Sequence, residues 1–331
     1  MIYLDNAGTT KVSESVKQAM LPFFDEIYGN ASSLYAFGQR AKEKLEDARA
    51  IVARCLNAQP NEIYFTSGGS ESDNWALMIA TQVGLRQNKK HIISTVFEHH
   101  AILHTLKKLE KQGFEVTYLP VYEDGIVKLA DVKNALRDDT CLVTVMFANN
   151  EIGTIEPIKE IGKIAKKHNI YFHTDCVQAI GNILIDVKQM NIDSLSISAH
   201  KFYGPKGVGA LYVRENVPFL KIQDGGHQEM DKRAGTENVA GIVGLGEAIE
   251  IAHKDFEKNN KKLLELRNYF ISELKKYISD VKLNGHKYNR LPGNVNVSFK
   301  NVNGGDLLFK LDEIGICVSS GSACNSKSNQ P

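Results

Sequence analysis

Lys201 stands in the stretch SISAHKFYGPKG, where a histidine and a lysine follow an alternating run of residues that predicts a β-strand. A lysine just beyond a strand end can reach into a cleft, where loss of water lowers the pKa of its amine and makes it a nucleophile toward carbonyl groups. Lysine is, however, rarely buried without a partner, so Lys201 taken alone is more typical of a surface charge. Its companions elsewhere in the chain must decide between the two interpretations.

The stretch FTSGGSESDN combines a strand end, two glycines and a helix start. Backbone N–H groups at a helix start have no partner within the helix and bind anions, and Gly68 and Gly69 let a phosphate approach the backbone closely. The same residues fit an ordinary turn in which Ser70 caps the helix and Glu71 lies in its first turn. The glycine and lysine pattern of nucleotide P-loops is absent, which argues against that class of site.

Three further stretches place polar side chains at predicted strand ends or helix starts. FEHHAILHTL begins a helix near His99, which would be a cap, a packed ring or a catalytic group. HTDCVQAIG ends a strand at Asp175, and its carboxylate is either a helix cap or the partner of a ligand's ring nitrogen. Gln178 follows one short turn later. FANNEIG places Asn150 at another strand end, as a ligand contact or a turn residue.

Together these stretches favour pyridoxal phosphate as a cofactor. Lys201 would bind its aldehyde, Asp175 would face its pyridinium nitrogen, and helix-start amides would hold its phosphate. In open α/β sheets the reactive groups lie at the carboxyl ends of the strands, where these residues are predicted to lie. The combination therefore favours a reactive Lys201 over a surface charge.

Cys324 lies in CVSSGSACNSKS, a small-residue, hydrophilic stretch without apolar neighbours. It is a candidate nucleophile, since a reactive cysteine needs an accessible thiolate, and the alternative is an exposed thiol without function. Cys317 is predicted to be buried on a strand and unreactive. The five cysteines form no CxxC pair, so neither a zinc site nor a disulfide framework is expected.

Helix and strand patterns alternate through the chain, which predicts an α/β fold with a mainly parallel sheet covered by helices on both faces. A long helical region over residues 240–278 then leads into a smaller α+β unit. We expect a large cofactor-binding domain over residues 15–260 and a small domain made of residues 1–14 and 261–331. One long amphipathic helix is predicted from an apolar stripe of Ala41, Leu45, Ala48, Val52 and Leu56.

Composition excludes several classes of protein. Hydrophobic residues make up 43% of the 331 residues, charged residues 24%, and the net charge is +1. These values are those of a globular protein with no field that attracts nucleic acid or a membrane surface. The apolar runs are too short to span a bilayer, and the first ten residues lack the basic and apolar leader of a signal peptide. We therefore expect a cytoplasmic protein with no direct nucleic-acid or membrane partner.

An ordered series of motifs resembles the cysteine desulfurases of the NifS and IscS group, within the fold-type-I pyridoxal phosphate enzymes. The series runs from YLDNAGTT through TSGGSES, EHHA, NNEIG, DCVQ, SAHKFYGPKG and RAGTEN to SSGSAC. The resemblance implies an aspartate aminotransferase-like fold, with a mainly parallel sheet of the seven-stranded type in the large domain. SSGSAC fits the group in which a long loop carries the catalytic cysteine.

The resemblance also implies roles for individual residues. Lys201 matches the lysine that binds the cofactor covalently, His99 the histidine that stacks on its ring, and Cys324 the cysteine that takes the substrate sulfur as a persulfide. Asp175 matches the partner of the pyridinium nitrogen, and Gln178 the donor to the ring hydroxyl. Gly69, Ser70, Ser198 and His200 match residues that contact the phosphate. Thr236 matches a threonine that reaches the phosphate of the other subunit, which implies a homodimer. Asn150 matches a contact to the substrate and the cofactor.

The activity that the resemblance implies is conversion of L-cysteine to L-alanine, with the sulfur passing to Cys324. From there it would pass to an iron–sulfur scaffold protein or another acceptor, such as a tRNA-thiolation factor. Cys324 would contact a cluster on such a partner only transiently, and no resident metal is expected. The alternatives are a selenocysteine lyase or aminotransferase, which would not depend on Cys324, and a non-catalytic relative that serves as a binding partner.

Several positions depart from the usual pattern of the family. Ser70 stands where threonine is usual but keeps the hydroxyl. Ala31 and Tyr35 replace a proline and a histidine, and Gly8 and Cys176 replace alanines. Family members also run on for several tens of residues past SNQP. We expect that segment to complete the small domain and to supply the arginine for the substrate carboxylate.

Overall fold

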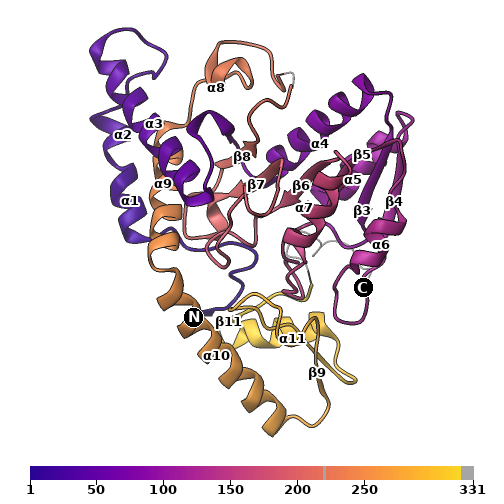
Figure 1. Cartoon of the computed structure of the whole chain (residues 1–331). Coiled ribbons are helices and arrows are strands. Elements are labelled where there is room, and N and C mark those ends of the chain that lie inside the picture. Colours follow the sequence, from indigo (N-terminus) through magenta and orange to yellow (C-terminus); the bar gives the residue numbers. More distant parts are fainter. Residues whose placement is uncertain (219–220, 322–331) are drawn as a thin grey trace.

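The structure is a computed structural model that describes residues 1–218 and 221–321. Its centre is a seven-stranded sheet (Figure 1). The strands are β2 (Ile63–Thr66), β3 (His91–Thr95), β4 (Glu115–Leu119), β5 (Thr140–Thr144), β6 (Tyr171–Asp175), β7 (Ser194–Ser198) and β8 (Gly209–Val213). They lie in the order β2-β8-β7-β6-β5-β3-β4. Only the β8 pairings with β2 and β7 are antiparallel, which confirms the predicted, mainly parallel sheet.

The register of the strands brings the predicted site residues to one edge of this sheet. Asp175, the last residue of β6, pairs with Ser196 of β7. Ser198, which ends β7, lies opposite Gly209, and Gly209 in turn lies opposite Thr66, which ends β2. The Lys201 stretch, the Asp175 stretch and the glycine-rich turn therefore leave the sheet side by side.

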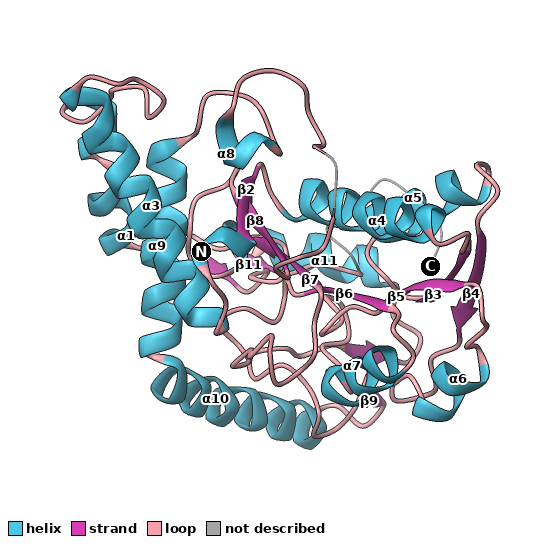
Figure 2. Ribbon diagram, turned by 45° about the horizontal axis from the view of Figure 1, so that its top comes forward, coloured by secondary structure: helices cyan, strands magenta, loops and turns pink. Residues whose placement is uncertain are grey.

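Helices cover both faces of the sheet, with α4 and α5 on one face and α6 and α7 on the other (Figure 2). Of two short 3-10 turns, η1 (Pro60–Glu62) directly precedes β2 and η2 (Ala199–Lys201) directly succeeds β7. The helices are α1 (Glu14–Met20), α2 (Pro22–Asp25), α3 (Ala36–Leu56), α4 (Gly69–Arg86), α5 (His100–Glu110), α6 (Leu129–Asn134), α7 (Ile158–Lys167), α8 (Gln228–Asp231), α9 (Val239–Lys254), α10 (Phe256–Tyr277) and α11 (Gly304–Glu313).

Each face of the sheet has its own apolar core. Ile92 and Ile93 are neighbours on β3 and are both fully buried, but they belong to different clusters because successive strand residues point to opposite faces. Ile92 packs in the cluster of Trp75 on α4 and Ile102 on α5. Ile93 packs in the larger cluster that includes residues of α3, α7 and α9. Burial of both faces explains why the strands read as apolar runs.

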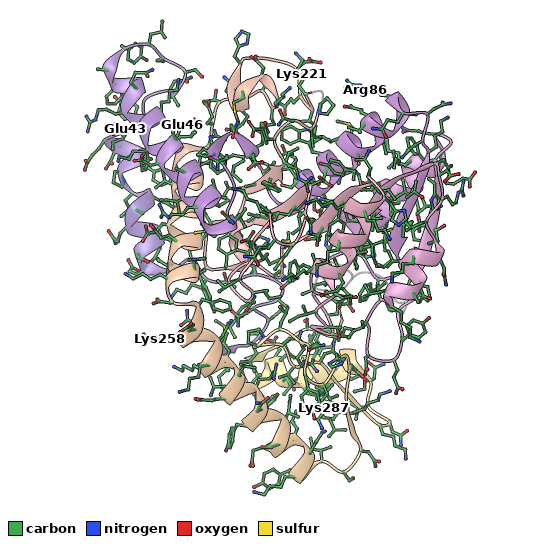
Figure 3. The ribbon with its side chains drawn as sticks, viewed as in Figure 1. Glu43, Glu46, Arg86, Lys221, Lys258 and Lys287 are labelled. Carbon is green, nitrogen blue, oxygen red and sulfur yellow. The ribbon has the colours of Figure 1, made fainter. Side chains whose placement is uncertain are left out.

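Helix α3 confirms the predicted amphipathic stripe, since all five of its apolar stripe residues are buried. Its charged residues Glu43 and Glu46 project from the outer side of the molecule (Figure 3). The buried side packs closely on α9, where a Cβ added at Gly246 would lie 2.9 Å from the Cβ of Ala48. The helix ends at Asn57, whose left-handed φ of 58° stops it.

Two predicted helices are each divided in the structure. The early helix breaks into α1 and α2 at Leu21, because Pro22 has no N–H to continue the first helix and starts the second. The helical region over 240–278 breaks at Asp255, which ends α9 and caps α10. Within the described ranges, no helix combines the length and apolarity that a membrane crossing needs.

The two ends of the described chain meet in a smaller unit beside α10 (Figure 1). Strand β1 (Ile2–Tyr3) pairs in parallel with β11 (Ile316–Cys317), and β9 (Val281–Leu283) pairs antiparallel with β10 (Val297–Phe299). The division into a large domain of residues 15–260 and a small domain of residues 1–14 and 261–331 stays a prediction. Cys317 does lie on a strand, but it is half-buried rather than buried, so that part of the prediction is wrong.

Candidate active site

The glycine-rich turn between β2 and α4 forms a tight backbone cradle. Gly68 occupies the cap position of α4 with a φ of 151°, which other residues rarely adopt. Gly69 lies so close to the end of β6 that a Cβ there would be 2.6 Å from Cγ2 of Val177. The first amides of α4 therefore begin beside the ends of β6 and β7, where helix-start N–H groups can hold an anion. Ser70 is exposed in the first turn, so the alternative in which it caps the helix is wrong.

Lys201 ends the short turn η2 directly after β7 and is half-buried. Its Nζ donates hydrogen bonds to the carbonyl oxygens of Ala7 at 2.5 Å and Gly8 at 2.9 Å. Nε2 of Gln178 donates to the same Ala7 oxygen at 2.9 Å. The amine is thus held against the N-terminal segment instead of extending into solvent.

Asp175 ends β6 with only 6% of its surface exposed. Its Oδ1 accepts a hydrogen bond from the N–H of Val177 at 2.8 Å, but this bond closes a turn, so the helix-cap alternative is wrong. Burial raises the pKa of Asp175 to about 7, and the Asp73 carboxylate adds to that rise, while the Val177 bond and the ring of His99 oppose it. The carboxyl is therefore poised to gain or lose a proton near neutral pH.

His99 is the cap of α5, and its Nδ1 accepts a hydrogen bond from the N–H of Ala101 at 3.2 Å. The cap interpretation is therefore correct, and it fixes the orientation of the ring. Burial lowers the pKa of His99, the Asp175 carboxylate acts to raise it, and the charge of Lys201 acts to lower it. Burial is the largest of these effects, so the environment favours the neutral form of the ring.

Behind Asp175 lies a layer of buried polar groups that sequence reasoning missed. Asp73 of α4 is 1% exposed, and its Oδ1 lies 3.4 Å from Nε2 of His173. Burial raises the pKa of Asp73 to about 7 and lowers the pKa of His173 to about 4. Glu98 is also buried, which raises its pKa well above its usual value. A signal did exist for His173, because it precedes Asp175 by two residues and so shares its face of β6.

The remaining predicted residues divide into two sets. Ser198 ends β7 beside the glycine-rich turn, and Nδ1 of His200 lies 3.0 Å from Oγ1 of Thr9. Asn150 is half-buried in the loop after β5, and Thr236 is exposed in the loop between α8 and α9. Cys324 lies outside the described residues.

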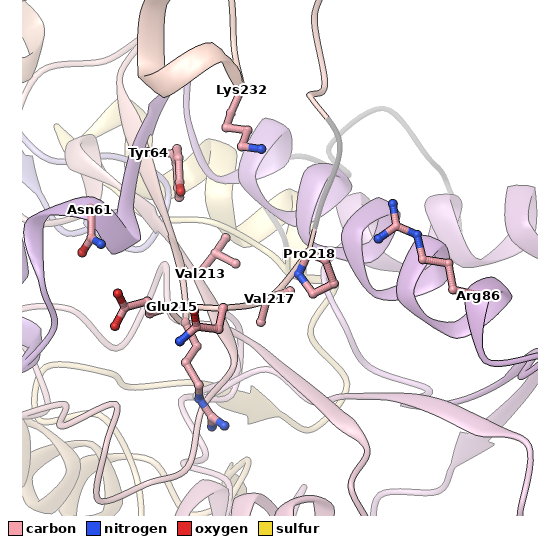
Figure 4. Close-up of a pocket in the computed structure, with 10 residues that line it drawn as sticks. Asn61, Tyr64, Arg86, Val213, Glu215, Val217, Pro218 and Lys232 are labelled. Atoms are coloured by element: carbon pink, nitrogen blue, oxygen red, sulfur yellow. The ribbon is translucent and has the colours of Figure 1, made fainter.

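A cavity of about 330 Å³ lies at the opposite edge of the sheet (Figure 4). It is lined by Val213, which ends β8 opposite the first residue of β7, and by residues of neighbouring elements that include Tyr64, Arg86 and Lys232. None of the residues that we predict to bind a cofactor or substrate lines this cavity. The candidate site is therefore formed by residues at the strand ends, and this cavity is not part of it.

The residues at the site fit pyridoxal phosphate. Lys201 supplies an amine, Asp175 a buried carboxyl for a ring nitrogen, and Gln178 an amide donor beside them. The cradle at Gly69, which a single Cβ would fill, suits a phosphate held by backbone amides. In the part of the chain that the structure describes, no group of three or more metal-ligating side chains could hold a metal ion.

Comparison with known proteins gives a consistent result. The profile of the aminotransferase class-V family matches residues 2–331. The chain is 56% identical to "Cysteine desulfurase IscS" of Clostridium botulinum over 332 residues, which cover 100% of this chain and 83% of the relative. It is 54% identical to the protein of the same name from Methanosarcina thermophila, over 100% of this chain and 81% of that protein.

Solved structures agree with these relatives. A structure titled "NIFS-LIKE PROTEIN" has a TM-score of 0.93 at 40% identity, over 96% of this chain and 87% of the other. A structure titled "SspA in complex with cysteine" has a TM-score of 0.86 at 36% identity, over 100% of this chain and 92% of the other. The α/β fold expected from the sequence is confirmed.

Proposed function

We infer that this chain, which belongs to the aminotransferase class-V family, is a cysteine desulfurase that converts L-cysteine to L-alanine. Its identity with the cysteine desulfurases spans the whole chain, and one structural neighbour was solved with cysteine bound. The single observation that carries the mechanism is the amine of Lys201, held at the sheet edge beside Asp175 and His99.

The cofactor that we propose is pyridoxal phosphate, which, when bound, supplies an electron sink that labilises the Cα proton of the substrate. Lys201 would hold its aldehyde carbon, Asp175 its ring nitrogen and Gln178 its ring hydroxyl. The first amides of α4, with Ser70, Ser198 and His200 beside them, would hold its phosphate. The support for this set is the convergence of three strand ends at one edge of the sheet.

The chain's own residues then have distinct tasks. The carboxylate of Asp175 would keep a proton on the ring nitrogen, because an opposite charge facing this buried group favours its ionised form. The ring of His99, oriented by the bond from the N–H of Ala101, would cover one side of the cofactor ring. The free amine of Lys201 would be the base for the Cα proton, and the carbonyls of Ala7 and Gly8 hold the amine at this place.

Sulfur transfer is assigned to Cys324 on the resemblance and on the relatives, since this residue lies outside the described part. Its thiolate attacks the sulfur of the substrate, so that a new sulfur–sulfur bond forms while the substrate's Cβ–S bond breaks. The electron pair of the broken bond stays on Cβ, which takes up a proton. L-Cysteine and the thiol thereby become L-alanine and a persulfide, with no outside oxidant or reductant.

The wider setting is also a proposal. We propose that the persulfide sulfur passes to an iron–sulfur scaffold protein or to another acceptor in the cytoplasm, as expected for proteins of this kind. We further propose that Asn150 contacts the substrate and the cofactor. A homodimer is supported by the exposure of Thr236, whose predicted ligand is the phosphate of the other subunit.

The decisive experiment is to incubate the protein with pyridoxal phosphate and L-cysteine, and then to measure the mass of the peptide that contains Cys324. One added sulfur atom per peptide, with an equal amount of alanine formed, is the expected result. Cys324→Ala should form neither product at a comparable rate, while Cys317→Ala should behave as the wild type does. Consumption of cysteine without sulfur on this peptide would instead favour a lyase or aminotransferase of the same fold.

A further inference from the structure

Glu71 lies one residue past the proposed phosphate contact Ser70, and its carboxylate is fully engaged. Its Oε2 accepts a hydrogen bond from the N–H of Ser67 at 2.8 Å. Arg233 donates to the same carboxylate through Nε at 2.9 Å and Nη2 at 3.3 Å. The two side chains are only 19% and 24% exposed. This ion pair joins the first turn of α4 to the loop between α8 and α9.

The location of Glu71 creates an electrostatic conflict that Arg233 resolves. An acid in the first turn of a helix competes with a bound anion for the same helix-start charge. A lone carboxylate there would also repel a phosphate dianion. Burial acts to raise the pKa of Glu71, but the hydrogen bonds from Arg233 and Ser67 outweigh it and keep this pKa below its usual value. The pair is therefore ionic, and Arg233 cancels the charge of Glu71.

A second, buried ion pair holds the loop that carries Arg233. Arg49 of α3 donates to Glu229 through Nη1 at 2.8 Å and Nη2 at 2.9 Å, and both side chains are almost fully buried. Glu229 also accepts the N–H of Phe65 at 2.7 Å. Phe65 lies on β2, the strand that leads into the glycine-rich turn. Both ion pairs of this loop therefore tie it to the junction of β2 and α4.

The backbone beside this anchor is strained. Glu229, Met230 and Asp231 have φ values of 47°, 55° and 62°, a left-handed run that side chains other than glycine disfavour. Such a run persists only where the surroundings impose it, and the bidentate pair with Arg49 supplies that constraint. The strained turn is what directs the chain from Glu229 back toward Glu71.

We propose that the Arg233–Glu71 pair is a charge-balancing element of the phosphate site. Arg233 is a positioning residue: it neutralises Glu71 and holds the segment from Ser67 to Glu71 in the shape that accepts a phosphate dianion. The Arg49–Glu229 pair anchors the backbone that precedes Arg233 and so positions Arg233 beside Glu71. The inference rests on the proposed use of pyridoxal phosphate, and it adds a requirement that concerns only the phosphate.

The test compares two aldehydes that differ only in the phosphate. The full-length protein without cofactor is titrated with pyridoxal phosphate and, separately, with pyridoxal, and binding is followed by absorbance. Arg233→Met should raise the Kd for pyridoxal phosphate roughly tenfold, because an unbalanced carboxylate then faces the dianion. Its Kd for pyridoxal should stay unchanged. Arg86→Met, an exposed arginine at the other end of α4, is the matched control and should change neither value.

A second variant keeps the proposal falsifiable if Arg233→Met also loosens the loop. Glu71→Gln in the Arg233→Met background removes the unbalanced charge but keeps an oxygen for the N–H of Ser67. It should restore most of the affinity for pyridoxal phosphate, and the difference between the single and double variants should shrink in concentrated salt.

The outcomes separate the two levels of inference. Equal weakening toward both aldehydes, or no recovery in the double variant, would show a merely structural role and overturn the charge-balancing proposal. Tight binding of pyridoxal phosphate by Arg233→Met would overturn it as well, while leaving the cofactor in place. Failure of the wild-type protein to bind either aldehyde would overturn the cofactor assignment and this inference together.

Discussion

Lys201 and Gln178 leave the sheet after different strands, yet both donate a hydrogen bond to the carbonyl oxygen of Ala7. The N-terminal segment is therefore a wall of the active site, although it carries none of the predicted catalytic side chains. It holds the amine by backbone oxygens, which cannot take the proton away. To bind an aldehyde, the amine would have to leave these carbonyls.

Lys201→Ala should abolish the visible absorbance of the bound cofactor and lower desulfurase activity by roughly 10³-fold or more, because both the covalent attachment and the base are lost. The measurement is an absorption spectrum together with alanine formation from L-cysteine. Lys206→Ala removes an exposed lysine from the same stretch and should keep both signals. Equal losses in the two variants would contradict the assignment of Lys201.

Asp175→Asn should change how the stability of the cofactor-free protein depends on pH. The pKa of Asp175 is about 7 in the fold and about 3.9 in an unfolded chain, so its stabilising contribution is complete below pH 3.9 and is lost as the pH rises to 7. An asparagine at position 175 cannot ionise, so the variant does not lose stability in this way as the pH rises. Its free energy of unfolding relative to the wild type should therefore increase from pH 4 to 7 and then level off.

Urea unfolding at several pH values measures this difference. Asp139→Asn is the control of opposite sign, because hydrogen bonds from Arg137 lower the pKa of Asp139. Its contribution to stability is complete above the unfolded pKa and is lost as the pH falls through the folded one. Parallel curves for Asp175→Asn and the wild type would show that the fold does not raise the pKa of Asp175.

Gly69→Ala should weaken the binding of pyridoxal phosphate and destabilise the fold by about 1–3 kcal/mol, as overpacking commonly does. The cause is one contact, since the added Cβ would lie 2.6 Å from Cγ2 of Val177. Val177→Ala in the same chain should therefore restore both properties, as measured by cofactor titration and thermal unfolding. A double variant as weak as Gly69→Ala would show that the cradle needs glycine for another reason.

Much of the site could be predicted from the sequence, because its side chains follow strand ends in short recognisable stretches. Lys201, Asp175 and His99 carry their chemistry in their side chains, and the parallel sheet brings them together. The carbonyls of Ala7 and Gly8 carry no such signature, since any residue would supply them. The site wall was therefore invisible in the sequence.

Long-range ion pairs and unusual backbone were also beyond sequence reasoning. Arg49 and Glu229 are 180 positions apart, and Glu71 and Arg233 are 162 apart, so no spacing rule connects them. The left-handed turn at Glu229 contains no glycine, the residue that would have indicated such a turn in the sequence. The break between α9 and α10 at Asp255 likewise has neither glycine nor proline beside it.

Thr236 should act on the site of the other subunit, and mixed dimers can show this. When Lys201→Ala and Thr236→Val are on different subunits, the one site with a lysine keeps a threonine and should bind the cofactor normally. When both changes are on one subunit beside a wild-type subunit, that site loses the threonine and should bind roughly tenfold more weakly. The reverse order of affinities would show that Thr236 serves its own subunit.

Arg49→Met should lower the free energy of unfolding by about 3–5 kcal/mol, because it leaves the carboxylate of Glu229 buried without its partner. Arg54→Met is the matched control on the same helix. Its ion pair with Glu250 is exposed, so its loss should cost less than about 1 kcal/mol. Chemical denaturation measures both values, and equal costs would mean that burial does not set the strength of these pairs.

The pairing of β1 with β11 has a consequence for how the protein is made. The residues that wall the Lys201 amine are among the first to leave the ribosome, but Ile316–Cys317, the strand that pairs with β1 just before them, is among the last of the described chain. A contact between such distant positions forms late, after the intervening sheet has folded. A nascent chain can thus complete its large sheet, and bond Thr9 and Thr10 to His200, before β1 has a partner strand, so the outermost end of this wall is fixed only when synthesis of the described chain is nearly over.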